Sequence, residues 1–223
     1  MGRHLVHAQL AAGARVLVPS RDPGRLAELA NFLGRDLPGQ FLPVEGDMAD
    51  EADAARLLRQ HGPLDGAVAS LGSFVRAPSV LDAAPKDLER ALRSYLLAHF
   101  AVARVLVPHL EARAAGYVMI NGPLAFEPRF PGAGLVSIAT AAQAMLAKVL
   151  MDESRGTRAR INEVVIYSSF GWGRDEDNDV TGADIGRYVA GLLAPEGAAI
   201  RGQTIHLTSP EALLSRAGKD GDA

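Results

Sequence analysis

The 223 residues include no cysteine, so a thiolate nucleophile is excluded, and tyrosine, histidine and serine are among the side chains that could move a proton. Tyr95 and Ser137 are two such side chains. The simpler interpretation of Tyr95 is an aromatic ring that fills space between apolar side chains. These residue types leave a catalytic role open without defining one.

Metal chemistry has little support in the sequence. His4 and His7 have the spacing of two ligands on one helix face, but no third ligand stands nearby. The alternating Asp175, Asp177 and Asp179 resemble part of a calcium loop, yet a valine and a glycine stand where that loop needs glycine and glutamate. We therefore assign no metal site.

The composition is that of a folded globular protein, with 48% hydrophobic and 22% charged residues. A formal charge of −3 gives no cationic footprint for nucleic acid or for an anionic membrane, so neither partner is expected. No stretch approaches the roughly 18 uninterrupted apolar residues of a membrane helix. Because the amino-terminal residues also lack the apolar core of a signal peptide, we expect a cytoplasmic protein.

Short apolar runs alternate with longer amphipathic stretches along the whole chain. Predicted strands cover residues 15–20, 40–45, 66–70, 117–121, 161–167 and 203–207. Predicted helices cover residues 3–12, 23–33, 50–60, 86–113, 134–154 and 182–193. Asp22 before Pro23 is typical of a helix start, and Gly13 and Gly34 are well placed to end the first two helices.

This alternation predicts a doubly wound α/β fold, because a parallel return needs a crossover long enough to hold a helix. The lack of a long linker predicts one domain over residues 1–215, followed by a flexible tail at 216–223. In such sheets ligands bind beyond the carboxyl ends of the strands. Functional residues are therefore expected at 19–22, 45–48, 70–75, 121–130 and 167–180.

Four segments in order carry a resemblance to the short-chain dehydrogenase/reductase family, over nearly the whole chain. They are AAGARVLVPSRDPGRLAEL, VEGDMADEAD, LDGAVASLGSF and VTGADIGRYVAGLLAPEGAAIRGQTIHL. They resemble the family's second, third and fourth strands with the segments that follow them, and its final helix and strand. The resemblance implies a Rossmann-like fold. It also implies a homodimer or homotetramer that packs through the helices at 86–113 and 134–154.

The sequence begins at the end of the glycine-rich turn that follows the first strand in this family. MGRHLV aligns with GIGRxxA, so Gly2 is the glycine of the turn that remains. Those glycines bring a helix amino terminus against the cofactor's pyrophosphate. The first strand normally lies in the middle of the sheet, and without it two edges must pair or stay exposed. We expect either a natural start upstream of Met1 or a genuine short form.

All four positions of the family's catalytic tetrad differ in this chain. The tetrad uses a tyrosine whose pKa is lowered by a lysine four residues later, with a serine and an asparagine. Val136 and Thr140 stand at the tyrosine and lysine positions, while Pro123 and Tyr95 stand at the serine and asparagine positions. These side chains do not support the usual ketone reduction. A proton would have to come from Tyr95, Ser137 or water, with Asn121, His99 and Tyr167 as further polar groups that the resemblance places near the pocket.

The resemblance also indicates residues for a dinucleotide. Arg21 stands where NADP-preferring relatives hold the 2′-phosphate, and Asp22 comes one residue too late to bind a free ribose hydroxyl. A helix cap with a solvated surface explains the same residues, and Asp47 and Gly72 each have a plain turn as their alternative. The residues expected to bind the cofactor are Gly2, Ser20, Arg21, Asp47, Met48, Ala69 and Gly72.

The function implied is that of an NADP(H)-linked oxidoreductase of a small carbonyl or alcohol, with a degenerate active site and with NAD(H) as the alternative cofactor. The competing hypothesis is a non-catalytic nucleotide-binding, scaffolding or regulatory subunit that kept the fold. The segment GWGRDEDNDVTG is expected to form a lid, with Trp172 as an apolar contact to the substrate. The substrate itself cannot be read from the sequence.

Overall fold

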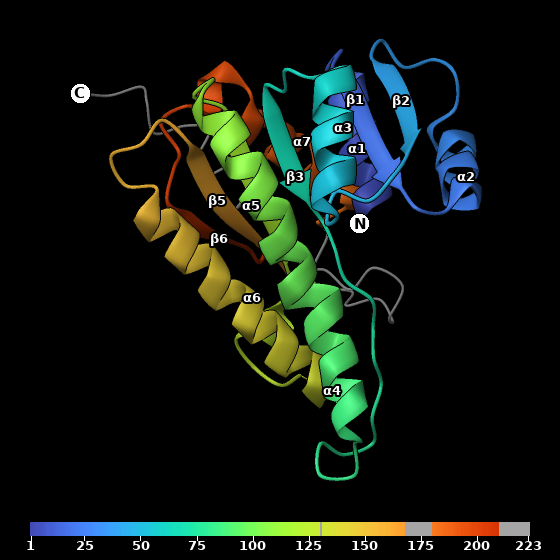
Figure 1. The fold of residues 1–223 in the computed structure, drawn as a ribbon, viewed down its shortest axis with the longest axis vertical. Coiled ribbons are helices and arrows are strands. Elements are labelled where there is room, and N and C mark those ends of the chain that lie inside the picture. Colours follow the sequence, from blue (N-terminus) through green and yellow to red (C-terminus); the bar gives the residue numbers. More distant parts are fainter. Residues whose placement is uncertain (130, 168–179, 210–223) are drawn as a thin grey trace. The chain divides into compact units, whose positions relative to one another are not determined.

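The computed structural model describes residues 1–129, 131–167 and 180–209 (Figure 1). The chain divides into two compact units that alternate along the sequence. The first takes Met1–Pro63, Tyr167–Gly197 and His206–Ala223, and the second takes Leu64–Ile166 and Ala198–Ile205. The predicted tail and Trp172 of the predicted lid lie outside the described residues. One domain over residues 1–215 stays a prediction.

The first unit contains a two-stranded parallel sheet and its helices. Its elements are α1 (Gly2–Ala11), β1 (Arg15–Ser20), α2 (Pro23–Leu33), β2 (Gln40–Glu45), α3 (Glu51–His61), α7 (Gly182–Leu193) and the short η3 (Pro195–Gly197). β1 and β2 pair in register from Arg15 opposite Gln40 to Ser20 opposite Glu45. α1 packs against α7, where a Cβ on Gly186 would lie only 2.7 Å from the His4 carbonyl oxygen. This glycine therefore lets the two helices approach closely.

Local capping signals set where these helices begin. The Asp22 side chain accepts the Gly24 N–H at 2.9 Å, and Pro23 supplies a backbone already shaped for the first turn of α2. Thr181 and Asp184 form a reciprocal capping box at the start of α7. Because these signals act within a few residues, the sequence predicts both starts correctly.

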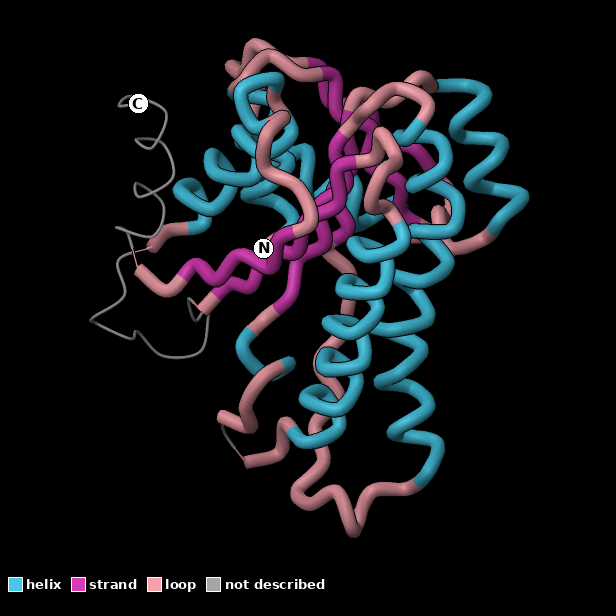
Figure 2. The backbone as a smooth tube through the Cα atoms, turned by 90° about the vertical axis from the view of Figure 1, so that its left-hand side faces the viewer, coloured by secondary structure: helices cyan, strands magenta, loops and turns pink. Residues whose placement is uncertain are grey.

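The second unit is built on a four-stranded parallel sheet. Its strands lie in the order β3 (Gly66–Ala69), β4 (Gly116–Asn121), β5 (Arg160–Ile166) and β6 (Gln203–Leu207), the last two residues of β6 being assigned to the first unit. Its helices are α4 (Pro85–Leu92), η1 (Arg93–Leu97), α5 (Ala98–Glu111) and α6 (Gly134–Glu153), with the short turn η2 (Pro123–Ala125). Figures 1 and 2 show α6 side by side with the helix that runs from α4 to α5. Every residue of β4 and β5 is buried, so this sheet forms the core of the unit.

The strands form two sheets rather than the single sheet that the alternation predicts. β1 pairs with β2 and β3 pairs with β4, but no strand joins β1 to β3 in the described ranges. In the strand order of doubly wound folds, a further strand, the first in sequence, would lie between β1 and β3. The strand predicted at 15–20 is found, but its residues are half-buried or exposed and not buried as a short apolar run suggests.

The helix predicted over 86–113 contains a π-helical turn. This turn, η1, joins α4 to α5 at Arg93–Leu97. A π turn inserts one residue into the helical ladder and so disturbs its backbone hydrogen bonds. The buried His99 ring compensates, since its Nδ1 hydrogen-bonds the Tyr95 carbonyl at 2.8 Å. Apolar periodicity cannot reveal such a turn, because the side chains on both sides keep a helical pattern.

Two helical stretches, Pro85–Glu111 and Gly134–Glu153, are long and apolar enough to cross a membrane by length and composition alone. Neither stretch contains the roughly 18 uninterrupted apolar residues that a membrane helix needs. Core helices of soluble proteins pass the same test, and α6 buries Leu135, Ala139 and Ala147 within the second unit. A parallel α/β sheet is not a membrane-spanning architecture.

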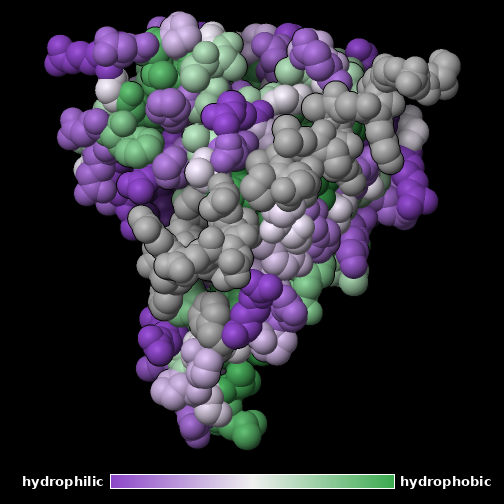
Figure 3. Space-filling view, turned by 180° about the vertical axis from the view of Figure 1, so that it is seen from behind, coloured by the Kyte–Doolittle hydropathy of each residue, from purple (hydrophilic) through white to green (hydrophobic). Residues whose placement is uncertain are grey.

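In the space-filling view, hydrophobic side chains are exposed at the lower end, where the segment before α4 carries Val80 and Leu81 (Figure 3).

Candidate active site

Ser20, Arg21 and Asp47 come together at the carboxyl ends of β1 and β2. Ser20 ends β1 opposite Glu45, and its carbonyl accepts the Gly46 N–H at 3.1 Å. The Arg21 guanidinium lies 3.4 Å from an Asp47 carboxylate oxygen, and 81% of the Arg21 side chain is exposed. Arginine favours ligands that offer several oxygen atoms. An accessible guanidinium thus stands at the strand ends, where doubly wound folds bind nucleotides.

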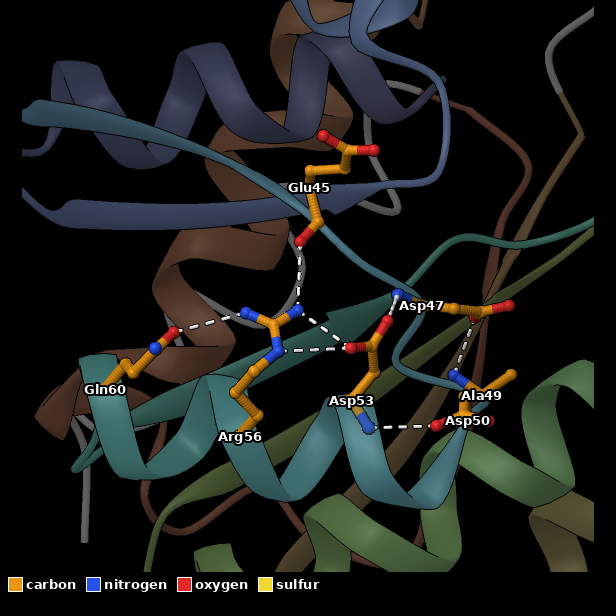
Figure 4. Close-up of polar contacts among 7 residues, drawn as sticks. All are labelled: Glu45, Asp47, Ala49, Asp50, Asp53, Arg56 and Gln60. Atoms are coloured by element: carbon orange, nitrogen blue, oxygen red, sulfur yellow. Dashed lines mark hydrogen bonds and ion pairs between the residues drawn. The ribbon is translucent and has the colours of Figure 1, made fainter.

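Asp47 and Met48 lie in the segment between β2 and α3. Asp53 holds Asp47 in place there (Figure 4). Asp47 Oδ1 accepts the Ala49 N–H at 2.9 Å, and the Asp47 N–H donates to Asp53 Oδ2 at 3.0 Å. Arg56 donates from Nη2 to Asp53 Oδ1 at 2.8 Å. The hydrogen bond from Arg56, followed by that from Asp47, holds the pKa of Asp53 below its ordinary value. The sequence analysis did not single out Asp53 and Arg56. An acidic residue followed three positions later by an arginine on a helix nevertheless indicates such a pair.

Asp22 serves the structure around α2. Its side chain caps the helix at Gly24, and a carboxylate oxygen lies 3.6 Å from Arg25 Nε. The Asp22 N–H donates to Ser20 Oγ at 3.1 Å. A carboxylate that already accepts from a helix terminus and an arginine is poorly available to a ribose diol. The geometry therefore weakens the case for a free 2′-hydroxyl at this position.

α1 begins at Gly2 with no side-chain cap, and Met1 is its N-cap residue. The first N–H groups of an uncapped helix attract anions. A Cβ on Gly2 would meet nothing within 4 Å, so packing within the first unit does not require glycine here. Burial, with Arg3 as a smaller cause, lowers the pKa of the Met1 amino group. A phosphate contact for Gly2 stays a prediction.

Ala69 and Gly72 belong to the second unit, where Gly72 lies beside Tyr95. Gly72 has a φ of 140°, and a Cβ there would lie 2.7 Å from Tyr95 Cδ1. The close approach predicted for this glycine is therefore made by the chain's own aromatic ring. His99 is completely buried nearby, and burial lowers its pKa, while the carbonyls of Tyr95 and Ala69 oppose that effect. The imidazole is thus held mainly as a neutral structural group.

Tyr95 is a poor general acid in this setting. Its ring packs against a cluster of buried apolar residues formed by Val75, Ala77, Ala91, Leu135 and Ala139. Burial raises the pKa of the Tyr95 phenol. The structure therefore favours the space-filling interpretation of Tyr95, since a phenol that holds its proton more tightly protonates a substrate less readily.

The remaining tetrad positions are apolar or internally bonded. Val136 is buried in α6, and the Thr140 hydroxyl donates to the Val136 carbonyl at 2.8 Å. Pro123 opens η2 and has no proton to give. The Ser137 hydroxyl is buried and finds no hydrogen-bond partner among the described residues. Ser137 therefore remains a weak catalytic candidate.

A buried carboxyl at Glu163 is the polar feature of this unit that the sequence did not predict. It lies in the middle of β5, accepts from Asn121 Nδ2 at 2.9 Å and from the Thr204 hydroxyl at 3.1 Å, and is fully buried. Burial raises its pKa, and the Asn121 and Thr204 hydrogen bonds act in the opposite direction. Asn121 also donates to the Thr140 carbonyl at 3.3 Å. This network ties β4, β5, β6 and α6 together behind the tetrad positions.

A hollow of about 570 Å³ lies at the other end of the sheet. It is lined by Lys148, Met151, Asp152, Ser154, Arg155, Arg201, Gly202 and Thr204. Gly202 and Thr204 stand at the start of β6, and Ser154 follows the end of α6. Because ligands of this fold bind beyond the opposite ends of the strands, we do not assign the hollow to the candidate active site.

Comparison with protein families identifies the chain. The model of the family described as short chain dehydrogenase matches residues 1–168. The chain belongs to the short-chain dehydrogenase/reductase family. Solved structures of other family members share its fold at low sequence identity.

L-sorbose reductase from Gluconobacter frateurii, complexed with NADPH and L-sorbose, is 18% identical, with a TM-score of 0.80, over 92% of this chain and 90% of that chain. An NADPH-bound short chain oxidoreductase from Pseudomonas aeruginosa PAO1 that contains an atypical catalytic center is 22% identical, with a TM-score of 0.77, over 92% and 90%. A putative gluconate dehydrogenase from Agrobacterium tumefaciens is 20% identical, with a TM-score of 0.76, over 95% and 91%. At these identities the structural likeness establishes the doubly wound fold.

Proposed function

We propose that this short-chain dehydrogenase is an NADP(H)-linked oxidoreductase of a small carbonyl or alcohol. The observation that carries the proposal is the exposed Arg21 guanidinium beside Asp47 at the ends of β1 and β2. Two solved structures of the same fold, L-sorbose reductase and the short chain oxidoreductase, hold NADPH. The competing hypothesis of a non-catalytic subunit rests on the changed tetrad positions, and the comparisons add nothing in its favour.

The charge arrangement supports a phosphate on the adenosine ribose. Among the described residues Arg21 pairs with the Asp47 carboxylate at 3.4 Å, and its side chain is 81% exposed, so most of its donors face solvent. A dianionic phosphate competes well for such a guanidinium, because it offers three acceptor oxygens and more charge than one carboxylate. Asp22, the acid that would favour a free ribose, is committed to capping α2.

These residues fit the adenosine half of the cofactor. Arg21 and Ser20 would face the 2′-phosphate, and the turn at Asp47 and Met48 would face the adenine. Asp53 fixes that turn through the Asp47 N–H at 3.0 Å. Bound NADPH would supply a hydride to the carbonyl carbon. The chain's own part is then to orient the nucleotide, to exclude water and to deliver one proton to the carbonyl oxygen.

Calorimetric titration of NADPH and NADH into the wild-type chain and Arg21→Ala tests the cofactor assignment. We expect the wild type to prefer NADPH, and Arg21→Ala to weaken NADPH binding by about 10-fold or more, since a charge-assisted contact contributes roughly 1.5–3 kcal/mol. NADH binding should change little.

Arg25→Ala is the matched control, because Arg25 is also an exposed arginine with one aspartate partner, its side chain being 80% exposed at 3.6 Å from Asp22. It should leave the affinity for both nucleotides unchanged. Equal losses of NADPH and NADH affinity in Arg21→Ala would show that Arg21 does not read the 2′-phosphate. A wild type that binds neither nucleotide would contradict the proposed function.

We also propose a cytoplasmic homodimer or homotetramer with no nucleic-acid or membrane partner. Apolar side chains are exposed along η1, α5 and α6, namely Leu97, Phe100, Ile138, Met145 and Val149. Burying such a face against a second copy would remove it from water. Light scattering at micromolar concentration should give twice or four times the 23.5 kDa chain mass, and a strict monomer would contradict this proposal.

A further inference from the structure

A phenol and an imidazole form a hydrogen-bonded pair where two adjacent strands end. Tyr167 directly follows β5, and His206 is the fourth residue of β6. The Tyr167 hydroxyl lies 3.0 Å from His206 Nδ1, and the ring centroids are 5.7 Å apart. The Tyr167 N–H also donates to the Leu207 carbonyl at 3.3 Å, which fixes the two segments relative to each other. The pair is therefore set by backbone geometry as well as by its own hydrogen bond.

Both side chains are accessible to a ligand. His206 is exposed between the buried Ile205 and Leu207, and Tyr167 is half-buried. The carboxyl ends of parallel strands are the side of this fold on which ligands bind. An exposed pair at that edge can meet a substrate, whereas Tyr95 is packed into an apolar cluster and the Tyr117 hydroxyl is buried with no hydrogen-bond partner in the described ranges.

The direction of the hydrogen bond decides what the pair can do. If the Nδ1–H of a neutral His206 donates to Tyr167 Oη, the imidazole does not hold the phenolic proton and it stabilises the phenolate that forms. If instead the phenol donates to a bare Nδ1, its proton is held by the imidazole and is not available to a substrate. The two cases differ in the ring nitrogen that carries the proton.

We propose that Tyr167, assisted by the Nδ1–H of His206, is the general acid of this short-chain dehydrogenase, in place of the tyrosine and lysine missing at Val136 and Thr140. This rests on the proposed reductase function. The carbonyl carbon gains the hydride of NADPH, the carbonyl oxygen gains the proton of Tyr167 Oη, and NADP⁺ and an alcohol are formed. The phenolate keeps the hydrogen bond from His206 until solvent returns its proton.

The tautomer of His206 tests the pair without any cofactor or substrate. Long-range ¹H–¹⁵N spectra of the imidazoles in the free protein, assigned with His206→Ala, should show His206 protonated on Nδ1. In Tyr167→Phe the phenolic acceptor is gone, so His206 should move toward the Nε2–H form that predominates for free imidazole side chains in water. A His206 protonated on Nε2 alone in the wild type overturns the proposal.

Reduction of 2,3-butanedione, an activated carbonyl probe, by NADPH tests the chemical role. Tyr167→Phe should lower kcat by about 10²-fold or more, the usual contribution of a general acid, with the Kd for NADPH unchanged. Tyr95→Phe is the matched control, because it removes a phenol from the other candidate position, and it should leave kcat within a few-fold of wild type. A loss that follows Tyr95 instead of Tyr167 overturns the proposal.

His206 variants separate assistance from mere packing. In His206→Asn the side-chain amide nitrogen takes the place of Nδ1, so it should retain more of kcat than His206→Ala does. Equal activity of the two variants at the wild-type level would show that His206 does not assist. A wild type that binds NADPH but reduces no carbonyl contradicts the reductase function itself. This outcome is seen in the wild-type protein, whereas a failure of the Tyr167 proposal is seen only when the variants are compared with an active wild type.

Discussion

The ring of Tyr95 lies against Gly72, so close that a Cβ on that glycine would stand 2.8 Å from Tyr95 Cζ. The two residues are 23 positions apart and are brought together by the turn after β3 and the π-helical turn η1. The backbone at Gly72 is also left-handed, with φ of 140°. Packing and conformation thus both demand glycine at this position, without any ligand.

Gly72→Ala should lower the free energy of unfolding by about 2 kcal/mol or more, because the methyl group overpacks the site and strains the backbone. In a Tyr95→Ala background the same substitution should cost about 1 kcal/mol less, since the overlap with the ring disappears. Urea denaturation of the four proteins measures both costs. Gly202→Ala is the control, because Gly202 has φ of 65° but open space around its Cβ position, so it reports strain alone. Equal penalties in the two backgrounds would contradict the contact.

Glu163→Gln should stabilise the protein at pH 8 and leave it nearly unchanged at pH 5. Burial raises the pKa of Glu163 above its ordinary 4.5, so the folded state keeps a proton that the unfolded chain releases. Stability present below pH 4.5 is therefore lost as pH rises toward the folded pKa. A glutamine can still accept from Asn121 and can donate to Thr204. Urea midpoints at the two pH values measure the effect.

Glu163→Leu is the contrasting variant, because it leaves Asn121 and Thr204 without their shared partner. We expect a loss of about 1–3 kcal/mol in the free energy of unfolding, mainly because the buried Asn121 amide loses its acceptor at 2.9 Å. If leucine were as stable as glutamine at both pH values, the buried network would not contribute to stability.

Asp53→Asn should remove the part of the free energy of unfolding that depends on an ionised Asp53 carboxylate. The hydrogen bond from Arg56 holds the pKa of Asp53 below its ordinary 3.8, so the stabilisation is present above pH 3.8 and is lost as pH falls through the folded value. The variant should unfold at a lower temperature at pH 7 and should lose less on acidification. Asp65→Asn is the control, because its side chain is 87% exposed and its pair with Arg113 should contribute under about 1 kcal/mol. Thermal unfolding from pH 3 to pH 7 gives both curves.

Asp22→Ala should cost about 0.5–2 kcal/mol through loss of the cap on α2. Because the Asp22 carboxylate serves Gly24 and Arg25, we expect no specific loss of NADH affinity. Denaturation gives the first quantity and calorimetric titration the second. A variant of unchanged stability that bound NADH much more weakly would return Asp22 to the cofactor site.

Local signals in the sequence determined the elements of this protein. Strands at 15–20, 40–45 and 203–207 and the helix at 182–193 are found at the predicted residues, because apolar periodicity, the Asp22 cap and the Thr181 capping box act over a few neighbouring positions. The order of these elements, with the quoted motifs, was enough for the family and the fold class. Arg21 directly follows β1 and Asp47 stands two residues after β2, so both lie at the predicted strand ends, while their role in cofactor binding stays a prediction.

Tertiary structure alone decided which distant residues meet. Glu163 lies in a strand that reads as a buried run, and only the register of β4, β5 and β6 brings Asn121 and Thr204 to its carboxyl. The Tyr167–His206 pair spans 39 positions and depends on the pairing of two strand ends. The division into two sheets depends on which strand edges find partners. Such contacts depend on register and packing between segments far apart in the chain, and no spacing within a single segment encodes them.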